Sequence, residues 1–502
     1  MASLAIIGGG VSGLAAGIYA QLSGIDSEIF ESHTIVGGQC TAWKRKGFHI
    51  DNCVHWMIGT KQETETYQVW KDVGVLGEGK EILRHDYFLK VNIDGITAHV
   101  WRDLDKMKAE LLAIAPEDEK EIKKLIRAIK HFQAIKLPSL KPKEQMSLTD
   151  NLKLVLSMPR AIPVAAKYGK MSIEDYAKCF KNPVLKALIA NYLPKHYYVL
   201  ATFYMYAMFS LGNADLPLGG SDMITNRMRD RYLALGGKIS CRKKAIKLTV
   251  DGTHVTQINF EDGTVTEPKN IICATDPDVT FKLLGQDYMD DFFRKCYSDK
   301  KCYPIFSEIN IYFAVDIPTD FLPSMEIFNC EPYEIAGKTY SKICMNNYAD
   351  QPKFAPEGKG LIQILIDQYE DDYDYWDNLY NTNRETYKQA KSDLADEIKI
   401  RLEKHYPELQ NILSVVEIVT PKSFNRYTGA YKGSYMGFIQ TPYVKKEIHP
   451  GVLKGLDNFY LAGQWLQTPG GLPNAVITGR FAVQRLLKRN DKINTFCCLK
   501  NN

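Results

Sequence analysis

One stretch near the N-terminus, LAIIGGGVSGLAAGIY at residues 4–19, constrains the fold of this chain more than any other feature. A short apolar run precedes Gly8-x-Gly10-x-x-Gly13, and a helical pattern follows it. In such a unit the first glycine permits a tight turn, the second lets a pyrophosphate approach the backbone, and the third lets the helix pack closely on the strand. Free N–H groups at the helix start favour a bound anion. The sequence therefore predicts a dinucleotide-binding strand–turn–helix unit in an α/β fold.

A second strand-like segment, DSEIFES at residues 26–32, places Glu31 about 20 residues beyond the glycines. A carboxylate at this distance accepts hydrogen bonds from the ribose of a dinucleotide and disfavours a 2′-phosphate. NADP is therefore disfavoured at this site, and NAD and FAD remain as candidates. A glycine-rich turn in an ordinary α/β unit is the alternative interpretation.

Length and composition limit the remaining possibilities. A chain of 502 residues is too long for one core of the usual size, so at least two structural units are expected. The net charge of +4 gives no case for nucleic-acid binding. The 11 cysteines contain no C-x-x-C pair, which argues against a disulfide framework or a metal site and favours reduced thiols in a cytoplasm. The apolar N-terminus has no basic leader, and it predicts a buried strand rather than a signal peptide.

Two further segments carry a resemblance to a known family. They are VGGQCTAWKRKGFHIDNCVHWMIGT at residues 36–60 and GLDNFYLAGQWLQTPGGLPNAVITGRFAVQRLL at residues 455–487. Together with the N-terminal glycines, they resemble the flavin-dependent family of phytoene desaturases, carotene isomerases and retinol saturases, whose fold is similar to that of amine oxidases. The resemblance implies FAD, held by a Rossmann-type, amine-oxidase-like α/β domain that carries an inserted mixed-sheet plus helical substrate domain.

The resemblance also implies which residues bind the cofactor. It places ADP on the first glycines and Glu31, the paired glycines beneath the cofactor, and the C-terminal loop over ribityl and isoalloxazine. The predicted cofactor-binding residues are Gly8, Gly10, Gly13, Glu31, Gly37, Gly38, Gln39, Ala245, Gly463, Gln464, Gly470, Gly471, Leu472, Pro473 and Ala475. The family often has Arg at the position of Gln39 and Asp at that of Gln464. Both replacements keep hydrogen-bonding capacity and lose charge, which puts the flavin potential and the cofactor orientation in doubt.

The same resemblance divides the chain into interleaved domains. Residues 1–100, 215–285 and 422–502 are expected to form the FAD-binding domain, and residues 101–214 and 286–421 the substrate and helical cap domain. Because the sequence has no second G-x-G-x-x-G, a separate NAD(P) domain is not predicted. NAD(P)H as a transient electron donor and the oligomeric state stay open.

Two residues are candidates for a proton role. His55 lies in the segment that the family runs along the flavin, where a proton donor or a substrate-orienting residue is expected; a hydrogen-bonded structural histidine is the alternative. Tyr431 belongs to a run of tyrosines, RYTGAYKGSYMGF at residues 426–438, which either share a helix face or lie in a glycine-rich loop.

The resemblance implies a flavoenzyme that saturates, desaturates or isomerises a C=C bond in a lipophilic, polyene- or isoprenoid-like substrate. The stretch DNCVHWMIG at residues 51–59 is similar to the retinol saturase side of the family and favours saturation. Amine oxidation on the same fold is a second interpretation, and it needs an aromatic cage beside the flavin. A prenyl-binding carrier of the Rab GDP-dissociation inhibitor type is a third, but it predicts decayed cofactor motifs, and all three are intact here.

Residues 133–170 combine basic and apolar side chains. Seven Lys and Arg stand against two acids, Glu144 and Asp150. This composition predicts peripheral contact with an anionic membrane, and a solvated loop at a domain edge is the alternative. The basic residues are Lys136, Lys141, Lys143, Lys153, Arg160, Lys167 and Lys170, and the interleaved apolar residues are Leu152, Leu154, Val155, Leu156, Met158 and Ile162.

Overall fold

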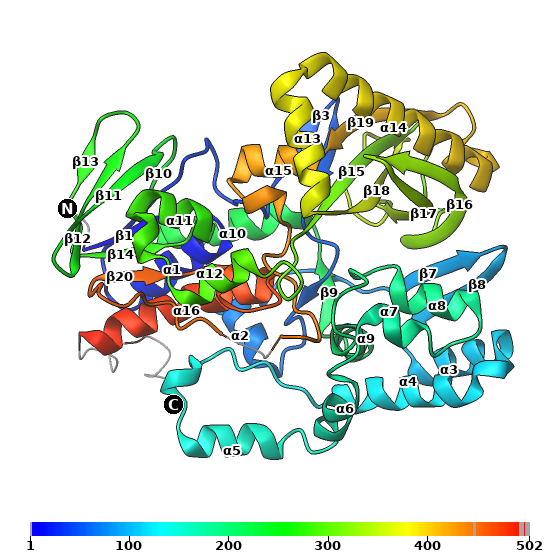
Figure 1. The fold of residues 1–502 in the computed structure, drawn as a ribbon, viewed down its shortest axis with the longest axis horizontal. Helices are drawn as coiled ribbons and strands as arrows, with labels where there is room; N and C mark the ends of the chain where they lie inside the picture. The colour runs from blue at the N-terminus through cyan, green and yellow to red at the C-terminus, as the bar shows by residue number, and fades with distance from the viewer. Residues whose placement is uncertain (1–2, 445–447, 491–495, 497–502) are drawn as a thin grey trace.

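The computed structural model describes residues 3–444, 448–490 and 496. Figure 1 shows the chain arranged as a nucleotide-binding lobe on one side, with a second lobe made of a large sheet and a group of helices on the other. Segments from both ends of the chain meet in the nucleotide-binding lobe, as the blue and red ribbons show.

A five-stranded parallel sheet forms the centre of the nucleotide-binding lobe. Its order is β10 (Lys238–Ser240), β2 (Ser27–Phe30), β1 (Leu4–Ile7), β14 (Asn270–Cys273) and β20 (Phe459–Leu461). The helices of this lobe are α1 (Val11–Leu22), α2 (Glu65–Asp72), α10 (Gly220–Ala234), α11 (Pro277–Leu284), α12 (Asp291–Ser298) and α16 (Leu472–Arg489). A strand–turn–helix unit at the N-terminus and an α/β fold are thus confirmed.

Strand β1 is buried on both faces, and its side chains alternate between two layers. Leu4 and Ile6 pack into a cluster with residues of α1 and α16, whereas Ala5 and Ile7 pack into a cluster with β11 and β12 of a three-stranded antiparallel meander. The meander strands are β11 (Ala245–Asp251), β12 (His254–Phe260) and β13 (Val265–Thr266). The uninterrupted apolar sequence of β1 follows from this two-sided burial.

The second lobe is built on a seven-stranded sheet. Its order is β19 (Leu413–Val419), β15 (Phe306–Val315), β18 (Gly360–Tyr369), β17 (Lys338–Asn347), β16 (Met325–Ile335), β7 (Tyr87–Ile93) and β8 (Ile96–Trp101). All neighbouring pairs are antiparallel except β16 and β7, so the sheet is mixed. Strands β7 and β8 come from residues 1–100, yet they pair with this sheet rather than with the nucleotide-binding one.

Alternation along β15 directs one face of the large sheet outwards and the other inwards. Ile309, Ile311 and Phe313 pack in a cluster with Trp376 and with residues 394–402 of the outer helices. The even-numbered residues from Phe306 onwards therefore point to the opposite face, towards the other lobe. The outer helices are α13 (Glu370–Thr382) and α14 (Arg384–His405), and α15 (Pro421–Thr428) follows β19.

The segment from residue 101 to residue 214 is mainly helical, as expected. Its helices are α3 (Leu104–Ile114), α4 (Glu119–Phe132), α5 (Leu148–Leu156), α6 (Ala161–Tyr168), α7 (Ile173–Ala177), α8 (Pro183–Ala190) and α9 (Leu200–Ser210). Figure 1 shows α5 at the lower edge of the molecule, apart from the other helices.

Short elements complete the chain. The remaining strands are β3 (Ala42–Arg45), β4 (Phe48–Asp51), β5 (Met57–Ile58), β6 (Ile82–Leu83) and β9 (Ala214–Pro217). Short 3-10 turns lie at Pro116–Asp118, Lys143–Gln145, Gln286–Tyr288, Pro407–Leu409, Tyr431–Gly433 and Gln464–Leu466. We propose that the expected division into an FAD-binding and a substrate domain applies with two changes. Strands β7 and β8 go with the substrate domain, and α12 goes with the FAD-binding domain.

Candidate functional site

A cavity of about 1560 Å³ runs from the carboxyl ends of the parallel strands to the inward face of the seven-stranded sheet. The N-terminal glycines, the loop that begins at Val36 and the C-terminal segment 463–475 line one part of it. Residues of β15, β17 and β18 line another. Pockets for a single small ligand usually occupy roughly 300–1,000 Å³. This cavity therefore has room for an extended dinucleotide and for a second molecule.

The first glycine turn has no side chains that would keep a pyrophosphate away from the backbone. Gly8 has φ of +100°, a conformation that favours glycine, and Gly10 precedes the first turn of α1. A Cβ added at Gly13 would lie 1.9 Å from the carbonyl oxygen of Gly8, so only glycine lets the helix approach the strand this closely. The N-terminus of α1 thus points free N–H groups at the cavity, as a bound pyrophosphate requires.

Glu31 lies beside the glycine turn and lines the cavity. Its Oε2 accepts a hydrogen bond from the backbone N–H of Gly9 at 2.7 Å, and its Oε1 accepts one from the N–H of His33 at 2.7 Å. The carboxylate is therefore held in place at the end of β2, with lone pairs left for the hydroxyl groups of a ribose.

The C-terminal segment brings a second helix N-terminus to the cavity. Helix α16 begins at Leu472, and Leu472, Pro473 and Ala475 line the cavity. A Cβ added at Gly470 would lie 1.8 Å from the carbonyl oxygen of Met436, so this loop also depends on a missing side chain. The positive end of the α16 dipole faces the region where the pyrimidine edge of a flavin is expected.

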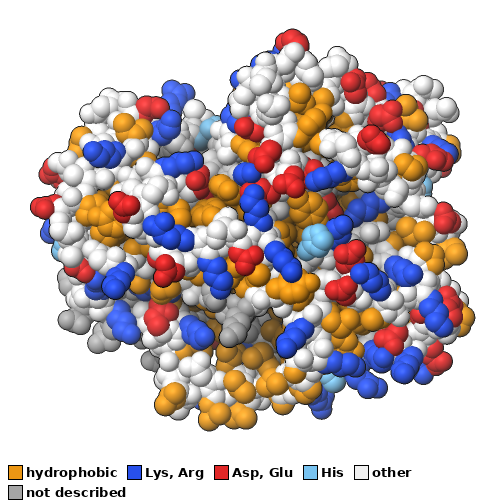
Figure 2. Space-filling view, in the orientation of Figure 1, with side chains coloured by type: hydrophobic (Ala, Val, Ile, Leu, Met, Phe, Trp, Pro, Cys, Tyr) orange, Lys and Arg blue, Asp and Glu red, His pale blue; other side chains and the backbone are white. Residues whose placement is uncertain are grey.

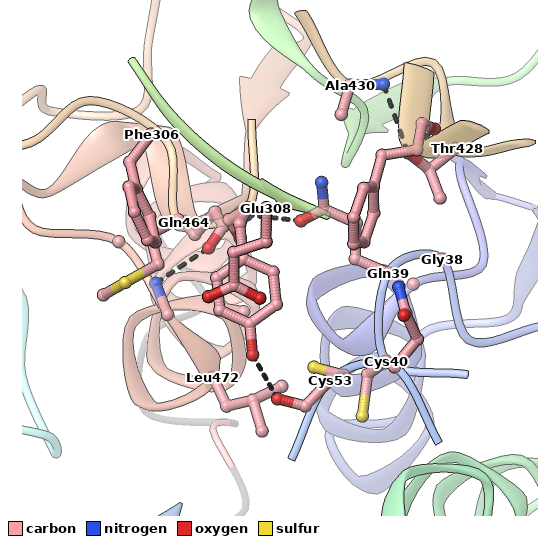
Figure 3. Close-up of a pocket in the computed structure, with 18 of the residues that line it drawn as sticks. Gly38, Gln39, Cys40, Cys53, Phe306, Glu308, Thr428, Ala430, Gln464 and Leu472 are labelled. Atoms are coloured by element: carbon pink, nitrogen blue, oxygen red, sulfur yellow. Dashed lines mark hydrogen bonds between the residues drawn. The ribbon is translucent and has the colours of Figure 1, made fainter. Parts of the chain in front are cut away.

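The two residues that depart from the family pattern are hydrogen-bonded to each other. Nε2 of Gln464 donates to Oε1 of Gln39 at 2.7 Å, and Nε2 of Gln39 donates to the carbonyl of Ser434 at 2.6 Å. Oε1 of Gln464 accepts from the N–H of Gly471 at 2.8 Å. Figure 3 shows this pair bridging the cavity. A neutral link thus joins the N-terminal and C-terminal loops where the family pattern has opposite charges.

The structure brings the predicted cofactor-binding residues together. Of the fifteen, Gly13 alone does not line the cavity, because it packs against the turn instead. The cradle of glycines without side chains, a fixed carboxylate and two helix N-termini fits FAD. In that fit Gly8, Gly10 and Glu31 would hold the ADP end, and Gln464 and Leu472 would lie at the flavin end.

His55 lines the cavity and is half-buried, with its Nε2 shielded from solvent. Its Nδ1 lies 3.5 Å from Nδ2 of Asn346 on β17, and its Nε2 has no hydrogen-bond partner. Burial lowers the pKa of His55 to about 4, so its imidazole is neutral at pH 7. The position of His55 is compatible with the predicted role towards a substrate.

Tyr431 occupies a different environment from His55. Helix α15 ends at Thr428, and Tyr431 lies in the glycine-rich loop that follows it. Its ring packs edge-on against Tyr297, and Tyr431 is not among the residues that line the cavity. Its position therefore does not support the predicted proton role. Tyr435, four residues on, does line the cavity.

Sequence reasoning missed the polar residues of the sheet face. Glu308 on β15, Lys342 on β17 and Asp367 on β18 line the cavity, and Glu308 stands opposite Asp367 in the strand register. The alternation in SEINIYFAVD at residues 307–316 shows only that Glu308 and Asn310 share one face of the strand, and the pairing of Glu308 with Asp367 needs the strand register.

Comparisons with known proteins agree with this geometry. A profile of the flavin containing amine oxidoreductase family matches residues 11–487. The 1-hydroxycarotenoid 3,4-desaturase of Flavobacterium sp. (strain P99-3) is 22% identical, over 97% of this chain and 99% of the relative. The chloroplastic prolycopene isomerase of Daucus carota is 25% identical, over 86% of this chain and 71% of the relative.

Solved structures show the same fold. Putrescine oxidase bound to putrescine aligns with a TM-score of 0.61 at 12% identity, over 97% of this chain and 99% of that one. Cyclohexylamine oxidase from Brevibacterium oxydans aligns with a TM-score of 0.57 at 13% identity, over 98% and 99%. With the family profile over nearly its whole length, the chain belongs to the flavin containing amine oxidoreductases, and it is an FAD-dependent oxidoreductase of amine-oxidase-like fold.

Proposed function

We propose that this flavoenzyme saturates or desaturates a carbon–carbon bond in a lipophilic, polyene- or isoprenoid-like substrate. The observation that carries the proposal is the aromatic wall of the cavity next to the flavin end. Five of its aromatic side chains come from three separate segments. They are Trp56, Tyr192, Tyr197, Tyr204 and Phe306. Such a wall suits a long apolar chain, because aromatic surfaces exclude water and pack against conjugated carbon.

Bound FAD supplies the redox chemistry by giving or taking a hydride, and the protein need only hold the carbon–carbon bond against it and exclude water. The aromatic wall orients the substrate, and the neutral His55 leaves the wall without a fixed charge at this point. The names of the desaturase and isomerase relatives support a polyene substrate. The names of the structural neighbours support amine oxidation as the alternative.

Anaerobic flavin spectroscopy tests the proposal. The FAD-loaded protein is photoreduced and mixed with prolycopene or a 1-hydroxycarotenoid in detergent micelles, and we expect the oxidised flavin bands to return as the polyene is reduced. In the opposite direction, the oxidised protein is mixed with putrescine or cyclohexylamine. Bleaching by an amine, with no response to either polyene, would overturn the proposal in favour of amine oxidation. Absence of flavin bands after reconstitution would favour a carrier.

Adding NADH or NADPH to the oxidised protein tests the open question of the electron donor. Rapid bleaching means that the nicotinamide reduces the flavin directly, and a reductase becomes the working description. Persistent bands mean that electrons pass to or from a different partner.

We further propose that residues 133–170 contact a membrane. Along α5, Leu148, Leu152, Val155 and Leu156 share one face by helical spacing, and all are more than half exposed, up to 89% for Leu148. Figure 2 shows hydrophobic side chains gathered at the lower edge of the molecule, where Figure 1 places α5. A group of exposed apolar side chains on one face of a helix indicates a surface that binds a partner.

Charge and position favour an anionic lipid surface as that partner. Exposed basic residues flank the apolar face, including Lys143, Lys153 and Arg160. Ile135 before α5 and Ala165 on α6 line the cavity, so the segment joins the apolar face to the substrate space. Within the described residues, no helix combines the length and the apolar character that a membrane crossing needs. The contact we propose is peripheral and is made by the exposed apolar face of α5.

Vesicle flotation tests the membrane contact. The protein is mixed with phosphatidylcholine vesicles with and without phosphatidylserine, and we expect binding that needs phosphatidylserine and weakens with salt. Changing Leu148, Leu152 and Leu156 to Ser should reduce binding at least about tenfold. Leu233→Ser, at a partly exposed leucine of α10, is the matched control. If the parent protein is a dimer that does not bind vesicles, and the triple variant is a monomer, the apolar face is an interface between copies of the chain.

A further inference from the structure

Glu308 presents a buried carboxyl group to the cavity. It lies two residues after Phe306 on the inward face of β15, and both side chains line the cavity. The residue is only 8% exposed, and its Oε2 has no hydrogen-bond partner. Figure 3 shows the carboxyl group directed into the cavity, between Gln464 and Leu472 in that view.

Other buried acids of this region already have partners. Asp276 lines the cavity too, but its carboxylate accepts hydrogen bonds from the N–H groups of Asp278 and Tyr431, both at 2.8 Å. Asp367, opposite Glu308, has Nζ of Lys342 at 3.4 Å. Among the described residues no basic side chain forms an ion pair with Glu308. Within the described residues, Glu308 thus has no ion-pair partner, and the neighbouring Asn310 side chain is the polar group that favours its charged form.

Glu308 lies at the flavin end of the cavity rather than at the ADP end. Its charge would act on Tyr435 and Tyr192, which line the same space. The carbonyl of Tyr435 accepts from Nε2 of Gln464 at 3.4 Å, and its hydroxyl donates to the carbonyl of Cys53. These contacts connect the neighbourhood of Glu308 to both loops predicted to enclose the flavin.

We infer that Glu308 is the acid–base group of this site, which gives a proton to one carbon of the substrate double bond or takes it back. The inference rests on the proposed function. Reduction of a C=C bond adds one hydride and one proton. A bound flavin would supply the hydride and Glu308 the proton, so that two C–H bonds form and one π bond breaks. Glu308 is left as a carboxylate and regains its proton from water. In desaturation the same proton and hydride move in the opposite direction, and the Glu308 carboxylate takes up the proton.

The protonation state of Glu308 fits this role. Burial and the neighbouring Asp367 carboxylate raise the pKa of Glu308 to about 8, so the group holds its proton at pH 7. Burial also raises the pKa of the Cys344 thiol to about 12, and it raises the pKa of the nearby tyrosines well above the ordinary value. The groups that face Glu308 are Asp367, Lys342, Cys344, Tyr192, Tyr312, Tyr348 and Tyr435.

Infrared spectroscopy tests the protonation state without any substrate. The carbonyl stretch of a protonated carboxyl is followed from pH 5 to pH 10 in the FAD-loaded protein and in Glu308→Gln. We expect a band that disappears with a midpoint near pH 8 in the parent protein and is missing from Glu308→Gln. Asp276, whose pKa burial raises to about 7, adds a second band that Glu308→Gln retains. If no band is lost in the variant, the inference is overturned.

Single-turnover kinetics test the proton transfer itself. Photoreduced protein is mixed with prolycopene, and the rate of flavin reoxidation is measured against pH. We expect Glu308→Gln to be slower by about 10²–10⁴-fold and to lose the fall in rate above about pH 8. FAD affinity should be unchanged. Equal rates and equal pH profiles would overturn the inference.

A matched control separates chemistry from folding. Glu326 is fully buried on β16 and paired with Lys90 at 3.1 Å, but it does not line the cavity. Glu326→Gln should lower the melting temperature and leave the pH profile of the reaction as it was. Failure of the proposed function has a different signature. No polyene would then reoxidise the reduced flavin or bleach the oxidised flavin of any of these proteins, whatever the infrared band of Glu308 does.

Discussion

The two parts of the cavity are built in different ways. The glycine loops present backbone to the cofactor, and each loop is a short continuous stretch of sequence. The inward face of the seven-stranded sheet presents side chains, and its members come from alternate positions of strands far apart in the chain, as Glu308 opposite Asp367 illustrates. A site formed by backbone groups needs particular residue types at fixed spacing along the chain. A site formed by side chains of paired strands needs only that polar and apolar residues alternate along each strand.

The largest effect is expected from a single methyl group in the backbone part. In Gly13→Ala the new Cβ would lie 1.9 Å from the carbonyl oxygen of Gly8, and neither the helix nor the strand can move away cheaply. We expect loss of FAD binding and a fall of at least about 3 kcal/mol in the free energy of unfolding. Helix propensity alone predicts the opposite, a gain of about 1 kcal/mol. Flavin content and chemical denaturation measure both quantities.

Gly24→Ala is the control for this substitution. Gly24 has φ of +76°, and an added Cβ would meet no atom within 4 Å. The variant should therefore cost only the strain of a left-handed alanine, about 1 kcal/mol, and keep its FAD. If Gly13→Ala and Gly24→Ala have the same FAD content and the same free energy of unfolding, close packing at the turn does not explain the need for glycine at position 13.

The contrast explains how much of the molecule could be predicted from its sequence. The strand–turn–helix unit and Glu31 could be predicted from spacing along the chain, whereas the C-terminal loop was predicted from a resemblance to a known family. Glu308 was missed because its significance arises only when β15 pairs with β18, and no local pattern encodes that register. Tyr431 was proposed on a four-residue period, but Gly429 takes a φ of +72°, ends the helix and turns the chain, so Tyr435 reaches the cavity instead.

The side-chain part of the site should be the more sensitive to pH. Burial lowers the pKa of His55 to about 4 from an ordinary value of 6.5. Between these values the unfolded chain binds a proton at His55 and the folded chain does not, so stability is lost as the pH falls through this window. The loss from this group is roughly 3 kcal/mol at pH 4. We expect His55→Phe to be less destabilised by acid than the parent protein, as measured by denaturation at pH 7 and pH 4.

An exposed histidine provides the comparison for His55. His254 lies on the surface at the start of β12, so His254→Gln should leave the acid sensitivity unchanged. If His55→Phe loses as much stability between pH 7 and pH 4 as His254→Gln does, burial does not lower the pKa of His55 in the folded protein. The imidazole that we place beside the substrate would then gain its proton in the ordinary range of a histidine.

The smallest effect is expected where the two parts meet, at the hydrogen bond between Gln39 and Gln464. A double-mutant cycle with Gln39→Ala and Gln464→Ala isolates this bond, and we expect a coupling energy of about 0.5–1.5 kcal/mol in the free energy of unfolding. Gln464→Ala alone should lower the free energy of unfolding more than Gln39→Ala, because it also leaves the N–H of Gly471 without its acceptor.

A second cycle, with Gln39→Arg and Gln464→Asp, replaces the neutral link by opposite charges. A larger coupling energy in this second cycle, together with a shifted flavin potential, would show that the neutral Gln39–Gln464 link lowers the stability of this chain. Equal coupling in both cycles would mean that the bond acts through geometry alone.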